Sequence, residues 1–198
     1  MTKKYPLYND VGQPQIAKFF DEPIKKSRMI SWKYFGKNIF FYVPSFVHYE
    51  NEYFRSSKNA FQSISITGKT CSLNCSHCGG KLLGAMIPAP SPKALVETCR
   101  ELKSRGAVGC LISGGCLPDG SVPLERFVDA IAEVKKLGLN VVVHTGLVDF
   151  YVASKLKQAG VDAVSIDVIG SEETAKEVYN IHASLEDYRQ SLLALKAS

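Results

Sequence analysis

The sequence predicts an α/β fold in which parallel strands alternate with helices. Short runs of strand character recur from residue 61 onward, and helical patterns of roughly ten to fifteen residues separate them. This order indicates parallel βαβ units, because consecutive parallel strands need a crossover of about that length. Right-handed crossovers then curl the sheet into a barrel or leave it as a doubly wound sheet.

Four strands are expected along the chain. The first, residues 61–67, alternates between apolar and polar side chains, which is typical of a strand. Three further strands are expected over residues 108–113, 139–144 and 161–169.

Five helices are expected between and after these strands. The first runs from Pro92 to about residue 104, because Ser91 suits an N-cap and proline is favoured at the first helical position. The second spans residues 122–137 and is closed by Gly138. The others cover residues 149–158, 172–179 and 185–196.

The size and composition suit one folded domain. The chain has 198 residues, of which 45% are hydrophobic and 10% aromatic, which argues against disorder. Its apolar runs are shorter than the roughly 18 residues needed to span a bilayer, and its start does not resemble a secretory signal. Six cysteines, three of them in one loop, indicate metal ligation in a reducing compartment. We therefore expect a cytoplasmic protein with no membrane partner.

The excess of positive charge lies near the N-terminus. Residues 1–58 carry ten Lys or Arg and five Asp or Glu, whereas the other 140 residues carry fourteen of each. The basic, aromatic stretch 25–33 is compatible with an anionic partner such as nucleic acid. We favour a solvated helix or loop face, because no nucleic-acid motif accompanies it. Residues 1–60 are expected to form an N-terminal extension that packs on the core.

Three cysteines stand close together directly after the first strand. Cys71, Cys75 and Cys78 follow one another at intervals of four and three residues. Thiolates at this spacing can bind three corners of a cubane iron–sulfur cluster and leave the fourth iron open to a small molecule. A structural zinc site would use four ligands, commonly from paired CxxC units, and His77 offers a fourth. We favour the cluster, because this cysteine order is unusual among zinc sites.

The spacing resembles the CxxxCxxC signature of the radical S-adenosylmethionine (SAM) superfamily, which lies in the loop after the first strand of a partial TIM barrel. The resemblance covers about residues 61–198. It implies a 4Fe–4S cluster and SAM as cofactors, with the open iron binding the amino and carboxylate groups of SAM. It also implies that one electron cleaves SAM to a 5′-deoxyadenosyl radical, which takes a hydrogen atom from a substrate.

The resemblance further implies partners and a fold. An electron donor of the flavodoxin or ferredoxin type would reduce the cluster, and the substrate would be a small molecule or a carrier-bound group. Residues 61–198 would form a partial (β/α) TIM-like barrel of the radical SAM type, with about four βα units. The family core usually has six units, so the fifth and sixth strands are missing. A shortened chain, a partner subunit that supplies the wall, or an open sheet would account for this. We favour the shortened chain, because the sequence stops after an amphipathic helix.

Ser113, Gly114 and Gly115 follow the second strand, at the end where active-site groups of βα barrels gather. The superfamily has a GGE-like motif here, whose backbone carbonyls meet the methionine amino group of SAM. In this chain Cys116 stands at the position of the acidic residue. Glycine suits a close approach of the backbone to a ligand. The alternative is a plain strand-to-loop turn.

Polar residues also mark the third and fourth strands. His144 ends the third strand, where it either serves a ligand or proton transfer or is a hydrogen-bonded structural residue. Ser165 and Asp167 share one face of the fourth strand, because side chains alternate with period two. Inward polar groups on an apolar strand suggest hydrogen bonds to a ligand, since burying them unpaired is expensive. In similar enzymes this place contacts the ribose hydroxyls of SAM, so we assign these residues to cofactor binding. No residue is assigned a catalytic role.

Residues 159–171 and the surrounding order of strands and helices resemble the biotin-synthase-like branch of the superfamily. The stretch 39–46 is similar to related archaeal-type proteins, including one partner of two-protein lipoyl synthases. Sulfur insertion is therefore one implied outcome, and it normally requires a second cluster. The spare thiols Cys99, Cys110 and Cys116 do not complete a second ligand set, and Cys99 is expected to pack within a helix.

Two classes of function remain. The first is a radical SAM enzyme, in which SAM changes the spectrum of a redox-active cluster. The second is a structural metal-binding or partner-dependent non-catalytic module, which would hold zinc tightly and lose stability on chelation.

Overall fold

The computed structural model describes residues 14–38, 50–52 and 59–198. The chain divides into two compact units, residues 1–42 and 43–198, and each is described by itself.

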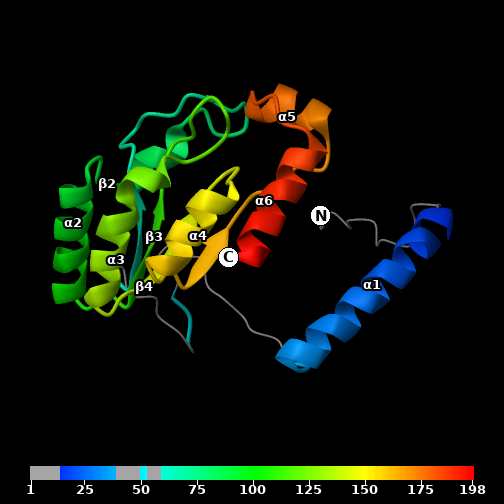
Figure 1. Cartoon of the computed structure of the whole chain (residues 1–198), viewed down its shortest axis with the longest axis horizontal. Coiled ribbons are helices and arrows are strands. Elements are labelled where there is room, and N and C mark those ends of the chain that lie inside the picture. Colours follow the sequence, from blue (N-terminus) through cyan, green and yellow to red (C-terminus); the bar gives the residue numbers. More distant parts are fainter. Residues whose placement is uncertain (1–13, 39–49, 53–58) are drawn as a thin grey trace. The chain divides into compact units, whose positions relative to one another are not determined.

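Unit 1 contains helix α1 (Pro14–Phe35), which the sequence analysis did not assign (Figure 1). The basic stretch 25–33 lies on this helix. There Lys25 Nζ pairs with Asp21 Oδ2 at 2.6 Å, one helical turn away. Such a pair is typical of a solvated helix face. The stretch 39–46 lies outside the described residues.

The described part of unit 2 contains one parallel sheet with the strand order β2-β1-β3-β4-β5 (Figure 1). Helices follow the strands in alternation, so the predicted α/β class is confirmed. The strands are β1 (Phe61–Ser65), β2 (Ile87–Pro88), β3 (Gly109–Ser113), β4 (Asn140–His144) and β5 (Ala163–Ser165).

The four predicted strands are present, and β2 is an addition that the sequence analysis missed. β2 is only two residues long, too short for a recognisable period, and it pairs with β1 at the edge of the sheet. Pro88 is tolerated there because an edge strand need not donate to a further neighbour. The fourth predicted strand, 161–169, was too long. β5 pairs with β4 over residues 163–165 only.

The predicted helices are also present, with one of them divided. Ser91 caps α2 as expected, because its hydroxyl accepts a hydrogen bond from Ala94 N–H at 3.2 Å. The helix predicted over 122–137 begins after Pro123 as a 3₁₀ turn, η3, and continues as α3. The helical elements of unit 2 are η2 (Lys81–Ala85), α2 (Pro92–Ser104), η3 (Leu124–Phe127), α3 (Val128–Lys136), α4 (Phe150–Gln158), α5 (Glu172–Tyr179) and α6 (Leu185–Ala197).

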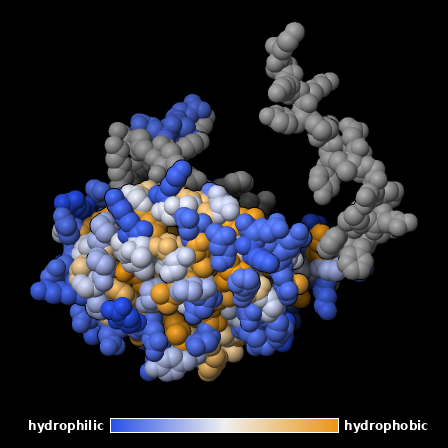
Figure 2. Space-filling model, turned by 90° about the horizontal axis from the view of Figure 1, so that it is seen from above, coloured by the Kyte–Doolittle hydropathy of each residue, from blue (hydrophilic) through white to orange (hydrophobic). Residues whose placement is uncertain are grey.

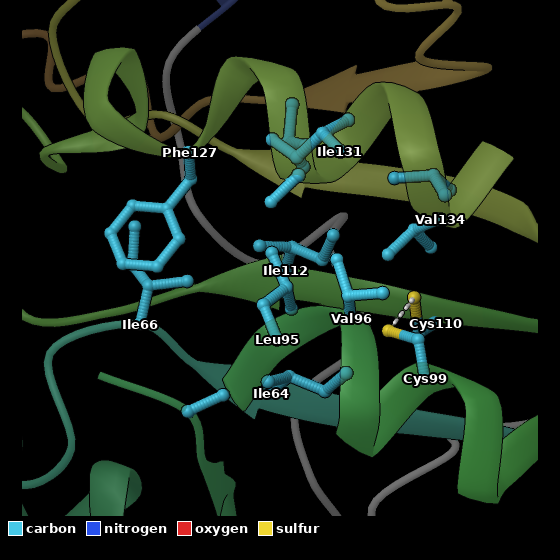
Figure 3. Close-up of a cluster of buried hydrophobic side chains, with 14 of the residues drawn as sticks. Ile64, Ile66, Leu95, Val96, Cys99, Cys110, Ile112, Phe127, Ile131 and Val134 are labelled. Atoms are coloured by element: carbon cyan, nitrogen blue, oxygen red, sulfur yellow. Dashed lines mark hydrogen bonds between the residues drawn. The ribbon is translucent and has the colours of Figure 1, made fainter. Parts of the chain in front are cut away.

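The main hydrophobic core lies between the sheet and helices α2, α3 and α4. Figure 3 shows Ile64 and Ile112 from the strands packing beside Leu95 of α2 and Ile131 of α3, and all four are fully buried. Because side chains alternate along a strand, the residues next to Ile64 and Ile112 point to the opposite face of the sheet. That opposite face is where the site described below lies.

Two of the spare thiols belong to this core. Cys99 on α2 and Cys110 on β3 are fully buried, and their sulfur atoms are 4.0 Å apart (Figure 3). The predicted packing role of Cys99 is confirmed. Cys110 points toward the helices, so it does not reach the opposite face of the sheet.

The outer surface is mixed in character. The face shown in Figure 2 is mostly hydrophilic, with smaller apolar patches between charged residues. No helix in the described ranges combines the length and the apolar character needed to cross a membrane.

Asp162 ties α3 to the sheet just before β5. Its carboxylate accepts hydrogen bonds from Lys135 Nζ at 2.5 Å and from Val141 N–H at 2.6 Å. The Lys135 contact and, second, the Val141 N–H lower the pKa of this carboxyl from its usual 3.8. Because the folded-state pKa is the lower one, this stabilisation is present above the unfolded-state pKa. It is lost as the pH falls through the folded-state pKa.

We therefore expect Asp162→Asn to lower the free energy of unfolding near neutral pH and to change it much less at an acidic pH below the folded-state pKa, where the wild-type carboxyl is also uncharged. Urea unfolding of both proteins at the two pH values checks this. An equal destabilisation at both pH values would contradict the expected role of the charge.

Candidate functional site

A row of polar side chains crosses the sheet at the carboxyl ends of its strands. Ser65 on β1 is paired with Ser113 on β3, and His144 on β4 is paired with Ser165 on β5. The residues just before them, such as Ile112, belong to the core on the helix side. The row therefore lies on the other face of the sheet. Three of the predicted site residues are thus brought into one row.

Asp167 follows β5 and joins this row. His144 Nε2 lies 3.5 Å from Asp167 Oδ2, and the two side chains are 26% and 68% exposed. Ser165 and Asp167 were predicted to be inward polar groups, but both are exposed. The reason is that β5, within the described sheet, has a neighbouring strand on one side only. The open face presents an imidazole beside a carboxylate, and these groups can hydrogen-bond to a ligand.

The three loop cysteines come together after β1. Cys75 is buried, while Cys71 and Cys78 are half-buried. Cys71 and Cys78 pack against the small hydrophobic cluster that contains Cys75, so the three thiols lie near one another. Burial and, next, the charges of Cys78 and Cys71 raise the pKa of the Cys75 thiol. Bound iron would offset both the burial of Cys75 and the repulsion between neighbouring thiolates, because a thiol that coordinates a positive metal loses its proton. The donor set therefore fits a metal cluster.

The side chains around the loop bear on the choice between a cluster and a single zinc ion. Within residues 14–38, 50–52 and 59–198, no three His, Cys, Asp or Glu side chains are placed to hold one metal ion. A single zinc ion would need each sulfur at about 2.3 Å from the same metal. In a cubane, each thiolate binds a different iron, so the sulfur atoms stand further apart. His77, the alternative fourth ligand, instead lies against the ring of Tyr179, with ring centroids 4.7 Å apart.

The end of β3 packs directly on the cysteine loop. A Cβ added to Gly115 would lie 2.1 Å from Thr70 O and 2.6 Å from Cys71 Cα, so only glycine fits there. The Gly115 N–H donates to Thr67 Oγ1 at 2.7 Å. Gly114 is less crowded, because its added Cβ would come no closer than 3.0 Å to the Thr67 side chain. The close approach at Gly115 is to the cysteine loop, and the predicted approach of this backbone to a ligand stays a prediction.

We expect Gly115→Ala to lower the free energy of unfolding by about 1–3 kcal/mol, because the added methyl group overpacks the loop backbone. Gly170→Ala is the matched control, since an added Cβ at Gly170 meets nothing within 4 Å. The control should stay within about 0.5 kcal/mol of wild type. Denaturant unfolding measures both variants. If the two substitutions have equal effects, Gly115 does not have the steric role described.

Cys116 stands beside the loop in place of an acidic residue. It is half-buried and packs against both the main core and the residues around the loop. Burial and, next, the charges of Cys71 and Cys75 raise the pKa of Cys116 to about 12. A neutral thiol is thus the expected form at neutral pH. The signal in the sequence that could have placed Cys116 beside the loop is that it directly follows Gly115.

The C-terminal end of α5 also packs against the loop, and this contact was not predicted from the sequence. Cys75 Sγ donates to Tyr179 O at 3.3 Å, and the Asn180 side chain contacts the loop backbone. These residues are 104 to 107 positions apart in the sequence, so no local pattern signals the contact.

A separate open groove of about 990 Å³ lies between helix α6 and the loops that follow β3 and β4. None of the predicted site residues lines it, so it is distinct from the cysteine loop and the polar row. Its polar lining includes Asp119, Thr145, Asp149, His182 and Gln190.

Comparison with known proteins identifies the family and the fold. The model of the Radical SAM superfamily matches residues 65–198. A biotin synthase of Leptospira biflexa serovar Patoc is 25% identical over 134 residues, which cover 65% of this chain and 37% of that enzyme. The crystal structure of methylornithine synthase has a TM-score of 0.51 and 16% identity, covering 91% of this chain and 48% of that one. The shared fold is a partial TIM-like barrel, as expected. This chain spans less than half the length of either relative.

Proposed function

This chain belongs to the radical SAM superfamily, whose cofactors are a 4Fe–4S cluster and SAM, and on that premise we propose that Cys71, Cys75 and Cys78 hold the cluster. When bound, these cofactors supply reductive cleavage of SAM to a 5′-deoxyadenosyl radical, which abstracts hydrogen from a substrate. The observation that carries the proposal is the packing of the three thiols around one small hydrophobic cluster in the loop after β1. The polar row at the same end of the sheet supports it.

The SAM side of the site is assigned to the remaining predicted residues. The backbone of Ser113, Gly114 and Gly115 would meet the methionine part. Ser165 and Asp167 would take the ribose hydroxyls, because both side chains are exposed at the carboxyl end of β5. His144 lies 3.5 Å from Asp167, so its ring orients the carboxylate and can share a proton with it.

Hydrogen abstraction from a substrate is the proposed outcome of SAM cleavage, and membership of the superfamily supports it. Sulfur insertion is the finer outcome suggested by the resemblance to biotin synthase. Cys99 and Cys110 are packed in the core, which leaves Cys116 as the one remaining spare thiol. The thiols of residues 59–198 therefore do not by themselves complete a second cluster for sulfur insertion.

The proposal includes partners and a setting. A flavodoxin or ferredoxin would supply the electron, and the substrate would be a small molecule or a group on a carrier. Six free thiols suit a reducing compartment, so we propose the cytoplasm.

Anaerobic reconstitution with iron and sulfide, followed by electron paramagnetic resonance of the reduced protein with and without SAM, tests the proposal. We expect a cubane signal that shifts when SAM is added. Absence of a cluster, with zinc retained, would overturn the proposal in favour of a structural metal module. A cluster whose signal ignores SAM would overturn the assignment of the SAM side.

A further inference from the structure

The cysteine loop is hydrogen-bonded to the last turn of α5. Ser76 N–H donates to Val178 O at 2.7 Å, and Ser76 Oγ donates to Glu177 O at 3.2 Å. Cys75 Sγ donates to Tyr179 O at 3.3 Å. The last carbonyls of a helix have no partner within the helix, so the loop supplies donors that α5 needs.

Asn180 completes this contact from the residue that ends α5. Its side-chain amide donates to Leu73 O and to Asn74 O, both at 2.9 Å. Both carbonyls belong to the stretch between Cys71 and Cys75. One side chain therefore holds the backbone that sets the distance between two of the thiols.

The backbone at Asn180 explains why this residue type is suited to the place. Asn74 and Asn180 are the non-glycine residues with positive φ in the described ranges, at 47° and 55°. Asparagine adopts this conformation more readily than most residues. Glycine would adopt it without the amide, and aspartate would bring oxygen where two donors are needed.

The loop and α5 also share a small hydrophobic cluster that is separate from the main core. Burial of this cluster holds α5 against the loop, and the hydrogen bonds fix how the two backbones align. The buried members of the cluster are Leu73, Cys75, Ile169, Ala175, Ile181, Ala183 and Tyr188.

We propose that Asn180 is a positioning residue for the metal-binding loop. Its amide fixes residues 73 and 74 so that Cys71 and Cys75 are held at the separation that a cluster requires. We call the two hydrogen bonds from the Asn180 amide to Leu73 O and Asn74 O the clamp. The clamp is a property of the chain without metal, whereas its link to a cluster rests on the function proposed above.

Asn180→Gly tests the clamp, because it removes both donors and keeps the backbone conformation. The matched control is Ser171→Ala at the other end of α5, where the Ser171 hydroxyl caps the helix by accepting from Thr174 N–H at 3.2 Å. In the metal-free full chain, hydrogen exchange of the Ser76 amide should be about tenfold faster in Asn180→Gly, since two hydrogen bonds are lost. The control should leave exchange at Ser76 close to wild type.

The reconstituted proteins give a second readout. Asn180→Gly should release iron to a chelator about tenfold faster than wild type and should show an altered paramagnetic resonance signal in the reduced state. A general loss of stability would not alter the signal of the protein that remains folded. Asn180→Asp should behave like Asn180→Gly, because it also lacks the donors.

The outcomes separate the clamp from the proposed function. Unchanged exchange at Ser76 in Asn180→Gly overturns the clamp, and so does an equal acceleration in Ser171→Ala. Faster exchange with an unchanged cluster signal and iron release overturns the positioning role. If wild type itself binds no iron, the proposed function fails and the positioning role fails with it, while the exchange experiment still decides the clamp.

Discussion

Replacing Cys75 with alanine is expected to reduce the iron and sulfide bound after anaerobic reconstitution to background. Cys75 is the buried member of the three loop thiols, at 7% exposure. A cubane held by three thiolates already has one iron without a protein ligand, and losing Cys75 would leave two. Iron and sulfide determination, together with the visible absorption of the reconstituted protein, measures the effect.

Cys99→Ala is the matched control for this experiment. It also removes a buried thiol, but one that lies in the main core, so the variant should bind as much iron as wild type. Circular dichroism of both variants shows whether each remains folded. Unchanged iron content in a folded Cys75→Ala protein would refute the assignment of the cysteine loop as the cluster site.

Asp167→Ala is expected to weaken SAM binding by about tenfold to a hundredfold while the cluster stays in place. A hydrogen bond to a charged group contributes about 1.5–3 kcal/mol, which corresponds to that range. The Asp167 side chain is 68% exposed beside His144, so its removal leaves no buried group unpaired. Titrating SAM against the paramagnetic resonance signal of the reduced cluster measures the affinity.

Asp129→Ala serves as the control, because Asp129 is an exposed carboxylate on α3. It should leave both iron content and SAM affinity unchanged. SAM affinity of Asp167→Ala equal to wild type would show that Asp167 makes no contact with SAM. Loss of iron from Asp167→Ala would instead indicate a structural role for this carboxylate.

Much of the fold of unit 2 was predictable from local patterns. Helix α5 begins and ends at the predicted residues, because Ser171 is a good N-cap and Asn180 adopts the left-handed conformation that ends it. The strands lie where short apolar runs precede glycine or a turn. β2 was missed because two residues show no period, and β5 was predicted too long because alternation does not reveal where a neighbouring strand ends.

The candidate site was predictable in part. The thiols were identified because their spacing is a property of one short loop. The shared face of Ser113, His144 and Ser165 follows from strand alternation and from register. The exposure of Asp167 was not anticipated, because exposure depends on what covers a strand edge.

The sequence by itself determined the alternation of strands and helices and the order of the three cysteines, because both depend on residues close together along the chain. Only the tertiary structure decided what holds those cysteines. The Gly115 backbone packs against Cys71, and Asn180 donates to carbonyls more than 100 residues away. Such contacts arise when distant segments pack together, and no local period carries that information.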